Sequence, residues 1–290
     1  ARYSGVGSNA AARVFCLNFE TRLKAASFFY GAVLYWGCKM IDLYFIGIGM
    51  GNPDHLTRQA IAELQTADVI LIPHKGAQKS DLADLRKTIC EKCLDPIPPL
   101  VYFDLPKRDS KTKTYLEGVV DWHSEIAKTW QDTLHRTLPN GGKAALMIWG
   151  DPSLYDSSLR IAQRLNPRKA AIRITVVPGL TSVQLLTAAH AIPLNALGAA
   201  VTYTTGRNLA DHGWPDKCES LVVMLDGQTA FDRLDPDAFE IWWGAFLGMP
   251  EQILISGRLS SCCEEIKTTR QRARETHGWI MDTYLLRPVP

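Results

Sequence analysis

The chain has 290 residues, of which 46% are hydrophobic and 21% are charged. This balance is typical of a soluble globular protein with enough apolar mass for one large or two medium cores. The formal net charge at pH 7 is only +2, so a broad nucleic-acid surface is not indicated, and any anionic partner must be held locally.

Residues 1–39 differ from the rest of the chain in charge. They contain one acid, Glu20, against the basic residues Arg2, Arg13, Arg22, Lys24 and Lys39. The apolar run AASFFYGAVLYWG near their end is too short to span a bilayer, and the basic stretch before it is long for a secretory signal. We therefore expect an extension that is disordered or not native to the working enzyme, with a targeting segment or a docked helix as alternatives. The folded protein is expected to begin near Met40.

Apolar runs of strand length recur along the rest of the chain, at 43–46, 69–72, 144–149, 172–177, 200–205, 221–225 and 253–256. Helical patterns lie between several of them, with apolar residues at three- and four-residue steps from Ile61 to Ala67 and from Leu116 to Leu134. Strands that alternate with helices indicate a largely parallel sheet, whose ligands bind at the carboxyl ends of the strands. The sequence thus predicts an α/β fold, and it contains no membrane-spanning run.

The first strand leads into a glycine-rich loop, IGIGMGNPDHLT, at residues 46–57. Its spacing is G-x-G-x-G, whereas a dinucleotide fold requires G-x-G-x-x-G and an acid at the end of the second strand. That strand ends in Ile72-Pro73-His74, and Asp68 lies at its other end. A nicotinamide oxidoreductase is therefore disfavoured, although it remains the alternative from a different functional class.

Two more motifs follow strands. In IWGDPSLYDSS, residues 148–158, Gly150 permits a close backbone approach, Asp151 can accept hydrogen bonds, and Pro152 suits a first helical position. In VVPGLTSVQLLTAAHAIPL, residues 176–194, a Pro-Gly turn and a Thr181-Ser182 cap precede a helix rich in small residues. Together with the first glycine loop, in this order and at these separations, they resemble the tetrapyrrole methylase family. The resemblance extends from about Met40 to Arg258, and further stretches such as DWHSEIAKTW and IPLNALG add to it.

The resemblance implies two α/β domains, residues 40–177 and 178–290, with S-adenosylmethionine bound in the cleft between them. By resemblance, the cofactor-binding residues are Trp149, Gly150, Asp151, Thr181, Ser182, Leu225, Asp226, Ser256 and Gly257. Relatives often carry a methionine where this chain has Leu225-Asp226, which makes that pair a departure from the family pattern. The first glycine loop is assigned to the tetrapyrrole substrate, through Gly47, Gly49, Gly51 and Asn52.

The implied reaction is C-methylation of precorrin-5 to precorrin-6A, in aerobic cobalamin biosynthesis, with release of acetate. Methyl transfer mainly requires alignment of the reactants, whereas deacetylation requires a base for water and a group that holds the developing oxyanion. The candidate catalytic residues at predicted strand ends are Tyr155, Asp156, His55 and His74, with His123 a further possibility, and the sequence does not decide among them. Basic residues suited to the substrate carboxylates are Lys75 and Arg160 first, then Lys79, Arg86, Arg108 and Arg207.

Other readings remain open at this point. The nearest is a tetrapyrrole methyltransferase that does not deacetylate; a methyltransferase of ribosomal RNA or diphthamide is more distant, and a non-catalytic tetrapyrrole-binding protein is the third. No metal is expected, because Cys90 and Cys93 lack the second half of a zinc site. The seven cysteines show no disulfide framework, which favours a reducing cytoplasm. The resemblance also implies a homodimer without nucleic-acid or membrane partners.

Overall fold

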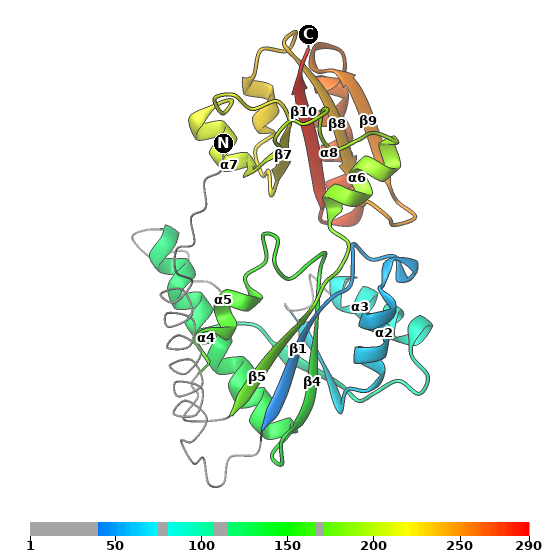
Figure 1. Ribbon diagram of the computed structural model, residues 1–290, viewed down its shortest axis with the longest axis vertical. Helices are drawn as coiled ribbons and strands as arrows, with labels where there is room; N and C mark the ends of the chain where they lie inside the picture. Colours follow the sequence, from blue (N-terminus) through cyan, green and yellow to red (C-terminus); the bar gives the residue numbers. More distant parts are fainter. Residues whose placement is uncertain (1–39, 75–80, 107–114, 166–170, 290) are drawn as a thin grey trace, which may run out of the picture. The chain divides into compact units, whose positions relative to one another are not determined.

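A computed structural model of the chain describes residues 40–74, 81–106, 115–165 and 171–289 (Figure 1), so the predicted extension at residues 1–39 lies outside it. The first sheet consists of β1 (Ile41–Gly47), β2 (Val69–His74), β3 (Leu100–Asp104), β4 (Gly142–Ile148) and β5 (Ile172–Val177). Its strand order is β3-β2-β4-β1-β5, and every neighbouring pair is parallel. The carboxyl ends of these strands therefore share one edge, which is where ligands were expected.

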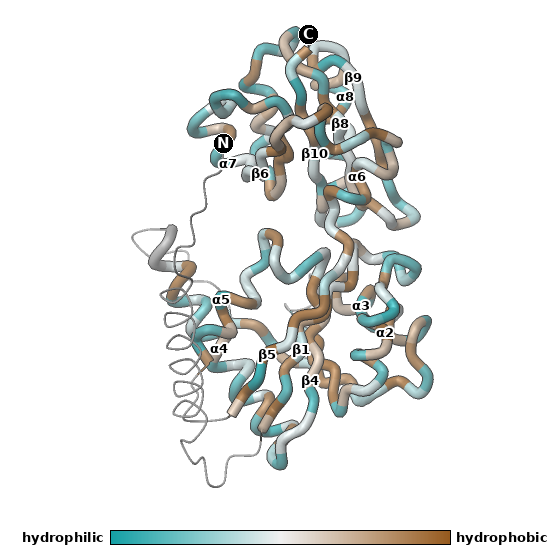
Figure 2. Tube along the Cα trace, in the orientation of Figure 1, coloured by the Kyte–Doolittle hydropathy of each residue, from teal (hydrophilic) through white to brown (hydrophobic). Residues whose placement is uncertain are grey.

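Different helices cover the two faces of this sheet. α2 (Arg58–Gln65) and α3 (Asp81–Cys93) pack on one face, and α4 (Tyr115–Thr137) and α5 (Ser158–Ala162) pack on the other (Figure 1). Along β1, Ile46 joins the core under α2 and α3, while Phe45 joins the core under α4 with its ring centroid 5.7 Å from that of Trp130. Because side chains alternate along a strand, one sheet supplies both cores. In Figure 2, hydrophobic residues accordingly run along the strands.

The second sheet is mixed. It consists of β6 (Thr202–Thr205), β7 (Leu221–Met224), β8 (Phe239–Ala245), β9 (Ile253–Arg258) and β10 (Asp282–Pro288), in the order β6-β7-β10-β8-β9. Only β6 and β7 are parallel, and the other three pairs are antiparallel. The expectation of a largely parallel sheet is therefore wrong for this half. The short connection from β8 to β9 contains no crossover helix, and consecutive strands joined in this way can pair only antiparallel.

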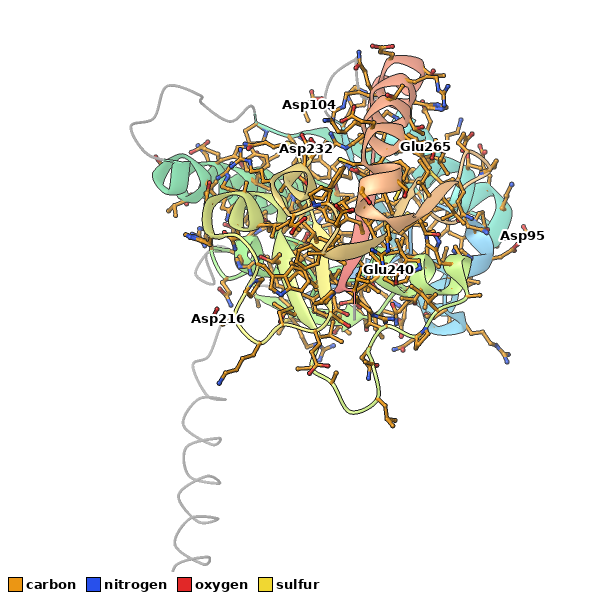
Figure 3. The ribbon with its side chains drawn as sticks, turned by 90° about the horizontal axis from the view of Figure 1, so that it is seen from above. Asp95, Asp104, Asp216, Asp232, Glu240 and Glu265 are labelled. Atoms are coloured by element: carbon orange, nitrogen blue, oxygen red, sulfur yellow. The ribbon has the colours of Figure 1, made fainter. Side chains whose placement is uncertain are left out.

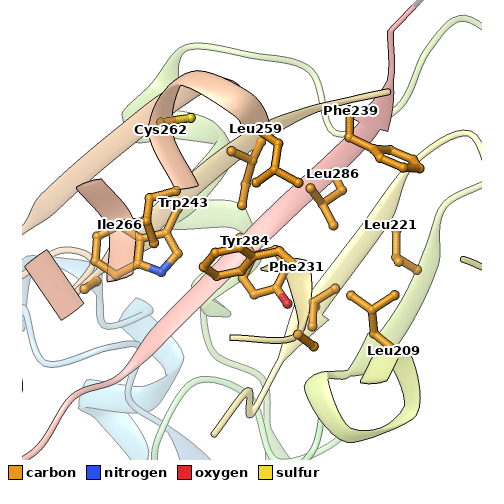
Figure 4. Packing of buried hydrophobic residues seen from close by; sticks show 14 of the residues in the cluster. Leu209, Leu221, Phe231, Phe239, Trp243, Leu259, Cys262, Ile266, Tyr284 and Leu286 are labelled. Atoms are coloured by element: carbon orange, nitrogen blue, oxygen red, sulfur yellow. The ribbon is translucent and has the colours of Figure 1, made fainter. Parts of the chain in front are cut away.

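The core of the second sheet is rich in large side chains. The sheet is accompanied by α6 (Ser182–His190), α7 (Gly206–His212), α8 (Leu259–His277) and the short helix η3 (Ala230–Arg233). Figure 4 shows Trp243 and Tyr284 packed among aliphatic side chains such as Ile266 and Leu286. The rings of Phe231 and Tyr284 meet edge to face, with centroids 5.3 Å apart and an interplanar angle of 89°. This geometry suits the charge distribution of aromatic rings.

The other predictions for elements have mixed outcomes. The helix expected over residues 116–134 is confirmed as α4, and the Thr181 cap is confirmed at α6. A helix starting at Pro152 is wrong, because residues 151–157 form turns and α5 begins only at Ser158. The strands β3, β8 and β10 were not predicted. The chain passes from the first sheet to the second after Val177, while the division into domains at 177/178 stays a prediction.

Within the described ranges, no helix has both the length and the apolarity needed to cross a bilayer. Figure 3 labels six acidic residues that come from several elements of both halves, among them Asp104 of β3, Asp232 of η3 and Glu265 of α8. All of them except Glu240 are exposed. These acids are thus spread over the surface rather than gathered on one face.

Candidate active site

Three glycines pack backbone against backbone where β1, β4 and β5 end. A Cβ added to Gly47 would lie 2.6 Å from the Gly179 nitrogen and 2.7 Å from the Gly150 oxygen, distances that real Cβ atoms do not reach. Gly150 also has a left-handed φ of 63°, and its nitrogen donates to the Gly49 oxygen at 2.8 Å. The bare backbone at Gly47 is therefore required by this crossing of three loops, whatever ligand lies nearby.

Asp151 joins two of these loops. Its Oδ2 accepts a hydrogen bond from the Gly179 nitrogen at 3.0 Å, and its Oδ1 accepts from the Ser153 nitrogen at 2.8 Å and from the Ser153 hydroxyl. Burial raises the pKa of Asp151, but these hydrogen bonds outweigh it, so the net pKa is lowered from the ordinary value of 3.8. The side chain of Asp151, a residue predicted to bind the cofactor, thus holds the turn, which leaves that role to its backbone.

A cavity of about 350 Å³, called cavity A here, lies beside the end of β7. Its lining includes Met50 of the first glycine loop, Ser182 of α6, Leu225 and Asp226 after β7, and Arg274 of α8. The predicted residues Ser182, Leu225 and Asp226 are therefore brought together. Met50 and Arg274 were not predicted, although Met50 lies within the quoted glycine motif.

The carboxylate of Asp226 faces protein rather than the cavity. It accepts from the Gln228 nitrogen at 2.8 Å, from the Ala230 nitrogen at 2.7 Å and from the Tyr284 hydroxyl at 2.7 Å. Burial, and then the charge of Asp226, raises the pKa of Tyr284 well above its ordinary value, which keeps the phenol protonated as the donor. The carboxylate of Asp226 therefore shapes the loop after β7, and its carbonyl accepts from Arg270, so only its backbone N–H remains for a ligand.

Leu225, which precedes Asp226, adopts a conformation that is unusual for leucine. Its φ is 53°, in the left-handed region, and its side chain is 66% exposed. It lines both cavity A and a second cavity. Asp226 and Gly206 are packed so closely that any side chain at position 206 would collide with the Asp226 carboxylate. This contact with Gly206 further restricts the loop after β7.

The second cavity, called cavity B here, has a volume of about 490 Å³ and lies at the ends of β2 and β4. It is lined by the predicted residues Trp149, Tyr155 and Asp156, and also by Arg86 of α3 and Trp130 of α4. Tyr155 has a φ of 50°, and burial raises the pKa of its phenol. Asp156 accepts from the Ser158 nitrogen at 2.6 Å through Oδ1. Two of the four candidate catalytic residues therefore share this cavity.

The histidines lie elsewhere. His55, at the end of the short helix η1 (Pro53–His55), lines a separate hollow with Asn52 and Gly248, and its Nδ1 is buried without a partner among the described residues. His74 lies at the end of β2 with its Nδ1 3.4 Å from the Asp104 carboxylate. His123 is 5% exposed on α4, and burial followed by Arg164 lowers its pKa. None of the three is a lining residue of cavity A or B.

The remaining predicted residues are spread more widely. Asn52 caps η1 by accepting from the Asp54 nitrogen at 3.0 Å. Arg160 is exposed, and its Nη1 donates to the Asp156 carbonyl at 3.0 Å. Lys75 lies outside the described residues. Thr181 uses its side chain in the α6 capping box, with Gln184 as the partner.

Ser256 and Gly257 lie on β9, opposite Trp242 and Ile241 of β8. Two strands, β10 and β8, stand between β7 and β9, and neither residue lines cavity A or B. Gly49 and Gly51 have positive φ, and a Cβ on Gly51 would collide with the Met249 side chain. The ligand roles assigned to these four residues stay predictions.

Among the basic residues suggested for the substrate carboxylates, Arg86 stands out by its burial. It was one of six flanking basic residues, yet it is 7% exposed and lies with its guanidinium carbon 5.0 Å from the centroid of the Trp149 ring. A signal existed in the sequence: Leu82, Arg86 and Cys90 recur at four-residue steps, which places the arginine on the buried face of α3. A charged residue at an apolar position of a helix is an indication of a site.

Comparison with known proteins gives consistent matches. Residues 42–262 match the family model described as Tetrapyrrole (Corrin/Porphyrin) Methylases. A precorrin-6A synthase [deacetylating] of Sinorhizobium sp is 45% identical over 250 residues, which cover 86% of this chain and 95% of the relative. A crystal structure from Corynebacterium diphtheriae, described as a cobalamin synthesis related protein (CobF), is 40% identical with a TM-score of 0.74, covering 87% of this chain and all of that one. A uroporphyrin-III C-methyl transferase from Thermus thermophilus, solved with S-adenyl homocysteine, is 19% identical with a TM-score of 0.51, covering 85% and 97%.

Proposed function

Because this chain belongs to the tetrapyrrole methylase family, we propose that it methylates precorrin-5 at a ring carbon and releases acetate, giving precorrin-6A. The name of the Sinorhizobium relative supports the deacetylating reaction over a plain methylation. The methyl donor is S-adenosylmethionine, and the pathway is aerobic cobalamin biosynthesis. The protein works in the cytoplasm as a homodimer.

One geometric observation supports the proposed function most directly: Leu225 lines both cavity A and cavity B. A methyltransferase with a second reaction must hold its methyl donor and the reacting part of its substrate side by side. Two cavities that share a wall residue provide such neighbouring compartments. In this assignment, cavity A holds the methyl donor and cavity B holds part of the tetrapyrrole.

The lining of cavity A fits S-adenosylmethionine chemically. Leu247 and Ile280 offer apolar surface for the adenine ring, and the exposed guanidinium of Arg274 suits the methionine carboxylate. Arg270 is not available for that role, because its Nε donates to Asp282 at 2.8 Å and its Nη2 donates to the Asp226 carbonyl. When bound, S-adenosylmethionine supplies a methyl group without its bonding electrons.

The electron pairs of the two steps balance on the substrate ring, so no oxidant or reductant is needed. The ring gives an electron pair to the new methyl group, and it regains one when the acetyl group departs to water. The residues of the protein therefore need to align the ring, exclude bulk water and hold the attacking water. Asp156 and Tyr155 are the candidates for holding that water, since they lie in cavity B, whereas His55 and His74 do not.

The test is one incubation of the protein with precorrin-5 and S-adenosylmethionine, without added metal or nicotinamide. Acetate and S-adenosylhomocysteine are expected in equal amounts. S-adenosylhomocysteine without acetate would assign the chain to a methyltransferase that does not deacetylate. Binding of both ligands without either product would leave a non-catalytic tetrapyrrole-binding protein.

A further inference from the structure

Arg86 is a buried cation that forms no ion pair with a carboxylate of the described residues. Its Nε donates to the Met147 carbonyl at 3.1 Å and its Nη1 donates to the Leu82 carbonyl at 3.0 Å. These bonds fix the guanidinium but do not neutralise it. Burial lowers the pKa of Arg86 to about 10, and the nearby charge of Asp156 opposes this shift, so the group remains protonated at neutral pH. A buried charge without a counter-ion is unfavourable, and binding of an anion would relieve it.

Two tryptophans of the same lining have indole N–H groups that lack acceptors. The Nε1 atoms of Trp130 and Trp149 are buried and have no hydrogen-bond partner within the described ranges, and Trp130 as a whole is only 4% exposed. A third tryptophan of the lining, Trp122, differs because its Nε1 donates to the Pro106 carbonyl at 2.7 Å. Buried donors in native proteins are rarely left unsatisfied. Among the described residues, the lining of cavity B thus combines one buried cation that has no ion pair with two indole N–H groups that have no acceptor.

We propose that cavity B is a binding site for a small carboxylate, held by Arg86 together with the indole N–H groups of Trp130 and Trp149. The rest of the lining includes Ile126, Leu146 and Ile148, which suit a methyl group better than a second polar group. Acetate is the smallest ligand with both parts. The inference rests on the proposed function only for the origin of this ligand, which is the acetyl group of precorrin-5 and the acetate that it becomes.

The same donors suit the deacetylation step. Water adds its oxygen to the acetyl carbonyl carbon, and the carbonyl oxygen gains negative charge, which Arg86 and the indoles stabilise. The bond between the acetyl carbon and the ring carbon then breaks, and its electron pair passes into the ring system. The added water loses both of its protons to solvent through Asp156 or Tyr155, one as it adds to the carbonyl and one when the product ionises to acetate. The acetate that forms carries both oxygens towards the donors that held the oxyanion.

The first experiment uses the protein without substrate. Sodium acetate is titrated while tryptophan fluorescence and the heat of binding are recorded, with acetamide and sodium chloride as probes at matched ionic strength. Saturable binding of acetate is expected, with acetamide weaker by about tenfold or more because the charge-assisted bond is absent. Absence of saturable acetate binding, or equal binding of chloride, overturns the proposal. The proposed methyltransferase function would survive that result, because S-adenosylhomocysteine binding at cavity A is measured separately.

Variants then identify the donors. Trp130→Phe removes one N–H and keeps an aromatic ring, so acetate affinity should fall by about fivefold to tenfold. Trp122→Phe is the matched control, because that N–H is already used by Pro106, and its acetate affinity should change by less than about twofold. Arg86→Met should abolish binding, and Arg86→Lys should restore it only in part, because lysine lacks the planar fork. Equal losses in the two tryptophan variants would overturn the role of the free N–H groups.

Turnover distinguishes the two sources of a carboxylate. If cavity B holds the acetyl group, Trp130→Phe and Arg86→Lys should lower the ratio of acetate to S-adenosylhomocysteine below one, with little change in KM for precorrin-5. If it holds a carboxylate side chain of the tetrapyrrole instead, KM should rise while the ratio stays at one. The second result would keep the carboxylate site and overturn its assignment to deacetylation.

Discussion

At the scale of single residues, Leu225 has a strained backbone conformation and lies between the two cavities. A leucine with a φ of 53° is unfavourable by roughly 1–2 kcal/mol relative to right-handed backbone, so the loop after β7 retains it against a local preference. Its side chain is exposed and lines both cavities. A largely exposed leucine, in a conformation that glycine would adopt freely, is explained best by the two cavities that it lines.

Leu225→Gly separates the two contributions. Glycine removes the strain but loses more conformational entropy on folding, so the free energy of unfolding should change by less than about 1 kcal/mol. The value of kcat/KM should fall, because the wall between the two cavities is lost. Chemical denaturation and steady-state kinetics measure the two effects, with Leu197→Ala as the control at a fully exposed leucine. Unchanged kcat/KM in the folded variant would contradict a role for the side chain.

At the scale of elements, the sequence predicts the first sheet better than the second. β1, β2 and β4 read as continuous apolar runs because both faces of a parallel sheet are buried by helices. β8 and β10 were missed for a physical reason: β8 interrupts its apolar residues with Glu240, and β10 begins with Asp282 and ends with Arg287 and Pro288. The Asp282 carboxylate is satisfied inside the sheet by Arg270 of α8 and by the Trp243 indole N–H, partners that no local pattern reveals.

The turn after β4 allows a test of how the free energy of unfolding depends on pH. Asp151 has a lowered pKa, so its ionised form stabilises the fold above the unfolded pKa, and this contribution is lost as the pH falls through the folded pKa, below 3.8. Asp151→Asn should lower the free energy of unfolding at pH 7 by about 1–2 kcal/mol, since an amide cannot accept all three hydrogen bonds with equal strength. The difference between the variant and the original protein should shrink as the pH falls below about 4. Denaturant titrations at several pH values measure it, with the exposed Asp54→Asn as the control; a difference independent of pH would contradict the assignment.

For the site, as for the strands, residues within a sequence motif were predicted better than residues that reach it only through tertiary packing. One motif contains Trp149, Tyr155 and Asp156, and all three line cavity B because they follow a strand end directly, although Trp149 was predicted to bind the cofactor. The motifs did not indicate Trp130, and Arg86 was suggested only after Lys75 and Arg160. Arg86 comes from α3 and Trp130 from α4, so both meet the motif only through the packing of helices on opposite faces of the sheet. Asp151 and Asp226 were predicted to bind the cofactor by resemblance to the family, whereas their carboxylates hold turns.

At the scale of the whole molecule, ligand binding should report on cavity A. S-adenosylhomocysteine at one hundred times its Kd should increase the free energy of unfolding by about 2.7 kcal/mol and so raise the midpoint of thermal unfolding. NAD should leave the midpoint unchanged. Arg274→Gln should weaken S-adenosylhomocysteine binding by about fivefold to twentyfold, because a charged hydrogen bond to the ligand carboxylate is lost. Arg272→Gln is the control, since Arg272 is exposed on the same helix but does not line cavity A. Equal affinities of the two variants would remove Arg274 from the cofactor site.

The strand order also determines which parts of a nascent chain can fold first. The first sheet contains only strands that precede residue 178, so the ribosome can release all of it while the second half is still being translated. The second sheet cannot form in that way, because β10 lies between β7 and β8. Until β10 is synthesised, β6 with β7 and β8 with β9 are two separate pairs with open edges, the state in which strands most readily join those of other chains. Slow translation just before Asp282 should therefore lower the yield of soluble protein, whereas a pause placed far enough after Val177 for β5 to have left the ribosome should allow the first sheet to form undisturbed.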